Sequence, residues 1–129
     1  MSLYSPVFHL YAVTGLYDLE EMCESDGVLN IRLALLKDAS RRLVVSFSNH
    51  LAFRKTGESE GLVMLNAIAT TSQPGLSFYV VEDSDYLRWL VEQSHGIQET
   101  QKLTHFAIIT IDDIIDVITL ELPSVSVID

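Results

Sequence analysis

The sequence predicts an α+β fold, with an antiparallel sheet of about five strands and two or three helices packed in two layers. Three observations predict it: several segments alternate between apolar and polar residues, one segment carries helix-capping residues at both ends, and short polar turns join neighbouring segments. The 129 residues, 48% hydrophobic and 20% charged, have the composition of one globular domain spanning residues 1–129.

The first two strands are expected in the segments VLNIRLALLKD, residues 28–38, and RRLVVSFSNH, residues 41–50. Both alternate with a period of two, which is typical of a half-buried strand. The polar residues KDAS between them predict a hairpin. The segment LAFRK, residues 51–55, is interpreted as a continuation of the second strand.

Three more strands are expected in LSFYVVE, LTHFAIITI and IIDVITLEL, residues 76–82, 103–111 and 114–122. Only Asp112 and Asp113 separate the last two, and a parallel crossover needs a dozen or more residues, so these strands form an antiparallel hairpin. The expected core is apolar and consists of Leu43, Val45, Phe47, Phe78, Val80, Leu87, Leu90 and Ile109.

One helix is expected in residues 59–70, whose apolar residues are spaced for one buried face. The segment YDLEEMCES, residues 17–25, is a candidate short helix that ends at Gly27. The best-defined helix lies in VEDSDYLRWLVEQSHGI, residues 81–97. Asp83 or Ser84 caps its start, and Gly96 supplies the residue that follows its end.

The apolar side of this last helix is too wide to face one sheet, and it includes Tyr86 and Trp89. Two interpretations remain. In one, both aromatic side chains belong to the core and its rim. In the other, Tyr86 and Trp89 form a surface that docks a protein partner, since exposed aromatic residues are favoured in interfaces.

The net charge restricts the classes of partner. Eight basic and eighteen acidic residues give a net charge of −10. Such a surface repels nucleic acid and anionic lipid, so we expect neither partner, and it attracts a basic protein. The plainer interpretation is that the charge keeps the domain soluble. Cys23 is the single cysteine, and a lone cysteine fits the reducing cytoplasm.

No metal or cofactor is expected. The four histidines are spaced too far apart for a zinc site, and the acidic stretch DDIID lacks the glycine of a calcium loop. The sequence contains none of the common phosphate-binding or nucleophile motifs. If the protein were an enzyme or bound a small ligand, the candidate residues would be Arg88, His105 and Asp116 in a pocket between helix and sheet.

Residues 78–97 and 104–125 resemble small uncharacterised bacterial domains that are presumed to be toxin-immunity proteins. The shared pattern is a strand, a Ser–x–Tyr–Leu–x–Trp helix, a strand with His and an aromatic residue, an acidic turn, and a strand that ends before Pro. The matching residues are Ser84, Tyr86, Leu87, Trp89, Ser94, Gly96, His105, Phe106, Asp113, Asp116, Val117 and Pro123. The resemblance covers roughly the last 50 residues and assigns no active residues.

These observations favour an acidic cytoplasmic protein-binding module, of the immunity type that neutralises a toxin, over a catalyst. The alternative is a small enzyme or ligand-binding domain that uses the pocket named above. The protein is expected to be a monomer or a weak dimer, and of these the apolar strands with open sheet edges favour a homodimer.

Overall fold

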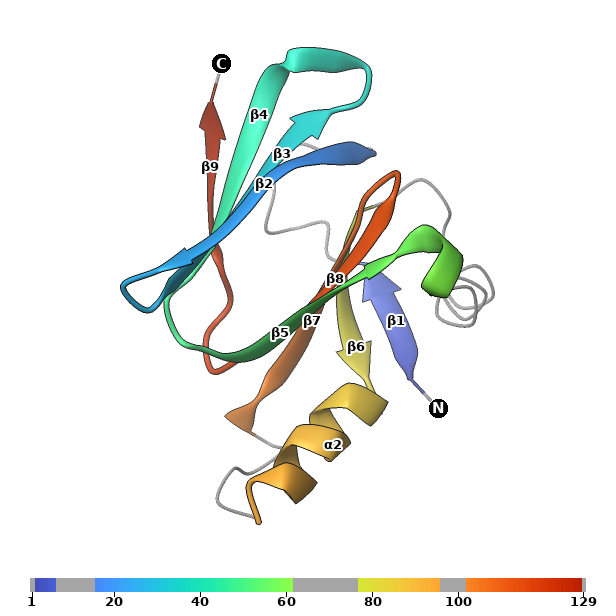
Figure 1. Cartoon of the computed structure of the whole chain (residues 1–129), viewed down its shortest axis with the longest axis vertical. Helices are drawn as coiled ribbons and strands as arrows, with labels where there is room; N and C mark the ends of the chain where they lie inside the picture. Colours follow the sequence, from blue (N-terminus) through green and yellow to red (C-terminus); the bar gives the residue numbers. More distant parts are fainter. Residues whose placement is uncertain (1, 7–15, 62–76, 96–101, 129) are drawn as a thin grey trace.

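The computed structural model describes residues 2–6, 16–61, 77–95 and 102–128, and two antiparallel sheets dominate them (Figure 1). The five-stranded sheet has the order β1–β6–β7–β8–β5, and the four-stranded sheet has the order β2–β3–β4–β9. The strands of the five-stranded sheet are β1 Leu3–Pro6, β6 Phe78–Glu82, β7 Thr104–Ile109, β8 Asp113–Thr119 and β5 His50–Gly57. The strands of the four-stranded sheet are β2 Tyr17–Ser25, β3 Val28–Leu35, β4 Asp38–Phe47 and β9 Ser124–Ile128.

The core lies between the two sheets. Alternate residues of β3 and β4 face it, including Ile31 and Val45, and they meet Phe106 and Val117 of the other sheet, all without exposed surface. Phe47 and Phe106 pack edge to face across this interior, with ring centroids 5.7 Å apart. The domain therefore buries its apolar side chains as a two-sheet packing does, with one face of each sheet turned inward.

The opposite face of the five-stranded sheet carries α2, Asp85–Gln93, across one end (Figure 1). Tyr86 and Leu87 of α2 pack with Leu103 and Ile118 in a second apolar cluster. Strand pairing sets the neighbours on this outer face, because Ala107 is opposite Asp116 and Asp116 is opposite Arg54. The same face therefore holds apolar and charged side chains beneath and beside the helix.

The predicted α+β class is wrong, because the described residues form two sheets and one α-helix, α2. The clearest error lies at residues 17–25, which form strand β2 and not a helix. A β-bulge between Leu19 and Glu21 shifts the register, so Tyr17, Leu19 and Met22 all contact the core. This spacing imitates one face of a helix.

The turn after β2 also differs from the predicted helix end at Gly27. Asp26 and Gly27 both have positive φ, 53° and 78°, and they connect β2 to β3. An Asp-Gly pair with positive φ at both residues is a hairpin turn, not a helix terminus.

Residues 51–55 also differ from the prediction. They do not extend β4 within its sheet but belong to β5, which crosses to the edge of the five-stranded sheet beside β8. The chain changes sheets around Ser48 and Asn49, between β4 and β5. This crossing brings Arg54 and Phe53 close to α2, a position that a continued hairpin would not have given them.

Other predictions are confirmed. The hairpins β3–β4 and β7–β8 form as expected. Of the predicted core residues, Leu43, Val45, Phe47, Phe78 and Leu87 are buried, whereas Val80, Leu90 and Ile109 are half-buried.

The predicted helix at 59–70 cannot be compared, because residues 62–70 lie outside the described residues; Glu58–Glu60 form the short 3-10 helix η1. In the described part of the chain, no helix has the length and apolar character needed to cross a membrane.

Candidate functional site

A buried polar network lies between α2 and the outer face of the five-stranded sheet. Its centre is Asp116, which has no exposed surface. One carboxylate oxygen of Asp116 lies 2.6 Å from Nε2 of His105, and the other accepts a hydrogen bond of 2.9 Å from Nε of Arg54. The histidine is 2% exposed. A buried carboxylate is stable only when it is paired and hydrogen-bonded in this way.

The network continues from His105 to the start of α2. Nδ1 of His105 lies 2.6 Å from Oγ of Ser84, which is the N-cap and accepts a hydrogen bond from the backbone N–H of Leu87. All these partners are satisfied when Nε2 of His105 carries a proton for Asp116 and Nδ1 accepts the hydroxyl proton of Ser84. The network therefore ties the first turn of α2 to strands β7 and β8.

A second chain of contacts leads from Asp116 to the surface. The guanidinium carbon of Arg54 lies 4.1 Å from the centroid of the Tyr86 ring. Tyr86 in turn stacks on Trp89, with centroids 5.8 Å apart and an angle of 21° between the rings. Trp89 is 50% exposed, whereas Tyr86 is buried. Arg54, Tyr86 and Trp89 thus form a stack, here called the aromatic stack, that begins at a buried carboxylate and ends in solvent.

Titration of the buried groups follows from these contacts. Burial raises the pKa of Asp116, but the hydrogen bond and electrostatic attraction of His105, followed by those of Arg54, outweigh burial and hold that pKa below its usual range. Burial, reinforced by the Asp116 carboxylate, raises the pKa of Tyr4 to about 12. Burial also raises the pKa of Tyr86, while Arg54 opposes that shift. At neutral pH the carboxylate is therefore charged and both phenols keep their protons.

The lowered pKa of Asp116 predicts a specific loss of stability in acid. In the unfolded chain this carboxyl group titrates near 3.8. Its interactions therefore contribute fully above that value and are lost as the pH falls through the lower pKa of the folded state. We expect the gap in unfolding free energy between the wild type and Asp116→Asn to shrink from about pH 5 to pH 2. Urea titrations measure this gap, and a constant gap would contradict the lowered pKa.

The structure brings together two of the three residues proposed for a pocket. His105 and Asp116 are directly hydrogen-bonded. Arg88 is not part of this pair; it contacts the exposed acids Asp83 and Asp85, and its Nη1 lies 2.5 Å from Asp83. The cation that binds Asp116 is Arg54 of strand β5. The contact of Arg54 with Asp116 was not predictable from the sequence, because it depends on the pairing of β5 with β8.

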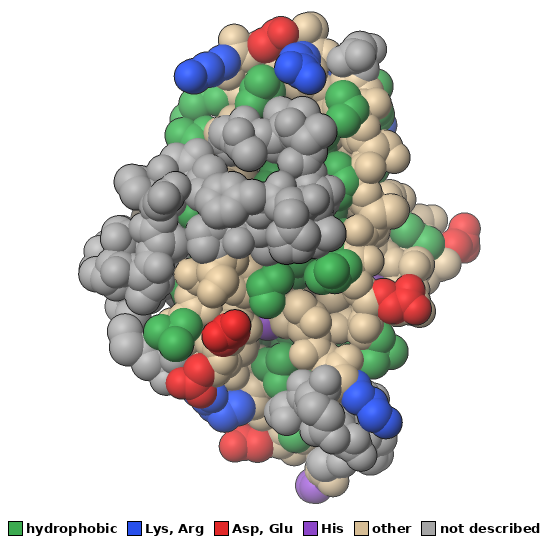
Figure 2. All heavy atoms as spheres, turned by 180° about the vertical axis from the view of Figure 1, so that it is seen from behind, with side chains coloured by type: hydrophobic (Ala, Val, Ile, Leu, Met, Phe, Trp, Pro, Cys, Tyr) green, Lys and Arg blue, Asp and Glu red, His purple; other side chains and the backbone are tan. Residues whose placement is uncertain are grey.

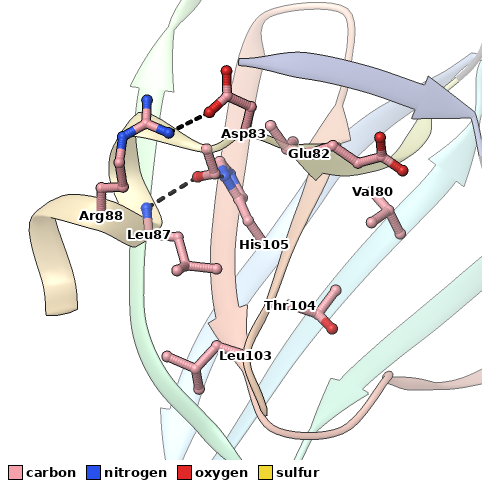
Figure 3. A pocket seen from close by; sticks show the side chains of 10 residues that line it. Val80, Glu82, Asp83, Leu87, Arg88, Leu103, Thr104 and His105 are labelled. Carbon is pink, nitrogen blue, oxygen red and sulfur yellow. Dashed lines mark hydrogen bonds and ion pairs between the residues drawn. The ribbon is translucent and has the colours of Figure 1, made fainter. Parts of the chain in front are cut away.

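The hollow beside this network is shown in Figure 3. It has a volume of about 490 Å³ and is lined by β6, β7 and the start of α2. His105 is among the residues that line it, and Arg88 and Asp83 form an ion pair at one side (Figure 3). Ser84 also lines it. The hollow therefore adjoins a row of serine, imidazole and carboxylate groups.

Serine, histidine and aspartate in this order are the groups of a nucleophilic relay. Here, however, the hydroxyl of Ser84 both caps α2 and bonds His105, and the residue is only 6% exposed. Attack by its oxygen on a substrate would require the first turn of α2 to open. The arrangement is explained more completely as a closed structural network that positions the helix and the aromatic stack.

A second hollow lies at the exposed end of the aromatic stack. Phe53, Arg54, Asp85, Tyr86 and Trp89 line it, and its volume is also about 490 Å³. Both residues proposed from the sequence for partner binding, Tyr86 and Trp89, belong to it. Trp89 offers an exposed ring, while the buried Tyr86 supports that ring from below. We call this site the aromatic hollow.

Acidic side chains surround α2. Glu82, Asp83, Asp85 and Glu92 are exposed, against one nearby basic residue of the same segment, Arg88, so residues 82–92 carry 1 − 4 = −3. From behind, both acidic and basic side chains are visible on the lower half of the molecule, the half that contains α2 (Figure 2). The segment that carries Tyr86 and Trp89 is therefore negative, while Arg54 adds one paired cation to the lining of the aromatic hollow.

Among the residues that the structure describes, no group of three or more His, Cys, Asp or Glu side chains is placed to hold a metal ion. No family model matches the chain, and neither a curated protein nor a solved structure matches it. The functional argument therefore depends on the geometry of the aromatic hollow and of the buried network.

Proposed function

We propose that this protein is an acidic binding module that docks a basic protein partner through the aromatic hollow. The observation that carries the proposal is the half-exposed ring of Trp89, stacked on a buried Tyr86. Large aromatic residues of this kind contribute most of the binding energy in many interfaces. A ring held by stacking loses little freedom on binding, which lowers the entropic cost of association.

The charge of the molecule supports a basic partner. The net charge is −10, and the segment that carries Trp89 is itself negative. Such a surface accelerates the approach of a positive protein and rejects negative ones. The partner that we favour is a protein toxin in the cytoplasm, which the chain would neutralise. This agrees with the resemblance described above, whose residues include Tyr86, Trp89, His105 and Asp116.

Affinity capture from cells of the native host tests the proposal. Wild-type protein is expected to retain a basic protein that is released by high salt, and Trp89→Ala is expected to retain much less of it. The matched control is Leu36→Ala, because Leu36 is as exposed as Trp89, at 49%, and directly follows β3 of the four-stranded sheet, whereas α2 packs on the five-stranded sheet. Equal capture by all three proteins would refute docking at the aromatic hollow.

A further inference from the structure

We propose that the aromatic hollow is a binding site for the guanidinium group of an arginine side chain, which the basic partner inserts beside Trp89. This inference rests on the proposed docking function and names the chemical group that is recognised. It follows from the way in which the protein binds one of its own arginines, from the lining of the hollow and from the local charge.

The protein already binds one guanidinium group, that of its own Arg54. Arg54 lies over the face of Tyr86 at 4.1 Å while its Nε bonds the carboxylate of Asp116. A planar cation between an aromatic face and a carboxylate is a favourable arrangement, because the ring quadrupole and the anion both attract it. The aromatic stack therefore already contains one guanidinium site, formed within the chain.

The aromatic hollow is lined by aromatic rings and by a carboxylate. Phe53 and Trp89 present exposed aromatic surface, and the carboxylate of Asp85 is 71% exposed beside them. The hollow thus repeats, at the surface, the pairing of aromatic face and carboxylate that holds Arg54. Indole is the ring that binds cations most strongly. A volume of about 490 Å³ leaves room for an arginine side chain.

The charged side chains of the hollow are already paired within the protein. Arg54 also lines the hollow, and its side chain is 41% exposed, but the ion pair with Asp116 offsets its charge and so weakens its repulsion of a second cation. Asp85 contacts Arg88, but this pair is on the surface, where such pairs are weak and exchange readily. An incoming guanidinium group is favoured over an ammonium group because its planar fork can stack on Trp89 and bond a carboxylate at the same time.

Titration of the protein with N-acetyl-arginine amide tests the site. Trp89 is the only tryptophan, so its indole N–H gives one identifiable NMR signal. We expect a saturable shift of this signal, with an affinity at least about fivefold higher than for the neutral N-acetyl-citrulline amide. N-acetyl-lysine amide is expected to bind more weakly than the arginine compound. Equal shifts with arginine and citrulline, or shifts that never saturate, would overturn the inference.

A matched pair of variants separates local from general charge effects. Asp85→Asn is expected to weaken binding of N-acetyl-arginine amide about threefold or more, whereas Asp18→Asn, which removes an exposed charge on β2, is expected to leave it unchanged. Equal weakening by the two variants would overturn the specific site. Thermal melting of both variants controls for folding.

The outcomes also distinguish this inference from the docking proposal. If N-acetyl-arginine amide does not bind but capture of the partner still depends on Trp89, docking stands and the guanidinium site is refuted. If the amide binds with the expected preference but capture does not depend on Trp89, the guanidinium site stands and docking at this surface is refuted.

Discussion

Replacing Asp116 by alanine is expected to lower the free energy of unfolding by about 3–5 kcal/mol, the usual cost of breaking a buried ion pair. The carboxylate has no exposed surface and satisfies His105 and Arg54 together. Without it, the buried Nε2 of His105 loses its partner and a cavity opens beneath α2. Total stabilities of natural domains are about 5–15 kcal/mol, so this change would remove a large share. Chemical denaturation measures the loss.

Asp113→Ala is the matched control for this prediction. Asp113 is on the same strand and also faces a cation of β5, Lys55, but at 3.4 Å and with half of the lysine side chain exposed. Surface pairs of this kind contribute about 0–1 kcal/mol, so the control is expected to lose much less stability. Asp116→Asn keeps the shape and separates the loss of charge from the loss of volume. A loss below about 1 kcal/mol in Asp116→Ala would show that the network does not hold the helix.

The second large effect is expected on the lifetime of the complex with the captured partner. Trp89→Ala should speed dissociation about 30-fold, the equivalent of the roughly 2 kcal/mol that defines an interface hot spot. Aromatic contacts act mainly on the dissociation rate, because they form after the two proteins have met. Half of Trp89 is already exposed, so we expect the variant to remain folded. Surface plasmon resonance gives both rate constants.

The salt concentration is expected to act on the association rate constant. Charges steer the approach of the partner, and they are screened over about 8 Å in physiological salt. Raising the salt concentration should therefore slow association tenfold or more while changing dissociation little. Leu36→Ala should match the wild type in both rates. If Trp89→Ala altered only the association rate, or if salt altered only dissociation, the assignment of these two roles would be wrong.

Much of the local structure was predictable from the sequence. Strict alternation in residues 28–38 and 41–50 identified β3 and β4, and the short acidic turn at Asp112 and Asp113 identified the β7–β8 hairpin. The sequence offers Asp83 or Ser84 as the cap of the helix, and Ser84 is the N-cap of α2. These features depend on neighbours within a few residues, so the sequence contains the necessary information.

The sheet arrangement was not predictable in the same way. Alternation shows that a strand has a buried face, but it does not show which sheet the strand joins. Thus β5 was expected to continue β4, although it pairs with β8, and β9 was not expected at all. The bulge in β2 changed the spacing of its apolar residues enough to imitate a helix.

The sequence by itself determined the segments of β3, β4, β6, β7 and β8, the two hairpins, the start of α2 and the acidic charge, because each depends on local pattern or on composition. Only the tertiary structure decided how the candidate site is assembled. Arg54 and Asp116 are 62 positions apart in the chain, and they meet because β5 pairs with β8 in one particular register. That pairing also places Arg54 under Tyr86 and leaves Trp89 in solvent. A side chain's own segment sets the face on which it lies, but the packing of distant strands sets which side chains it contacts.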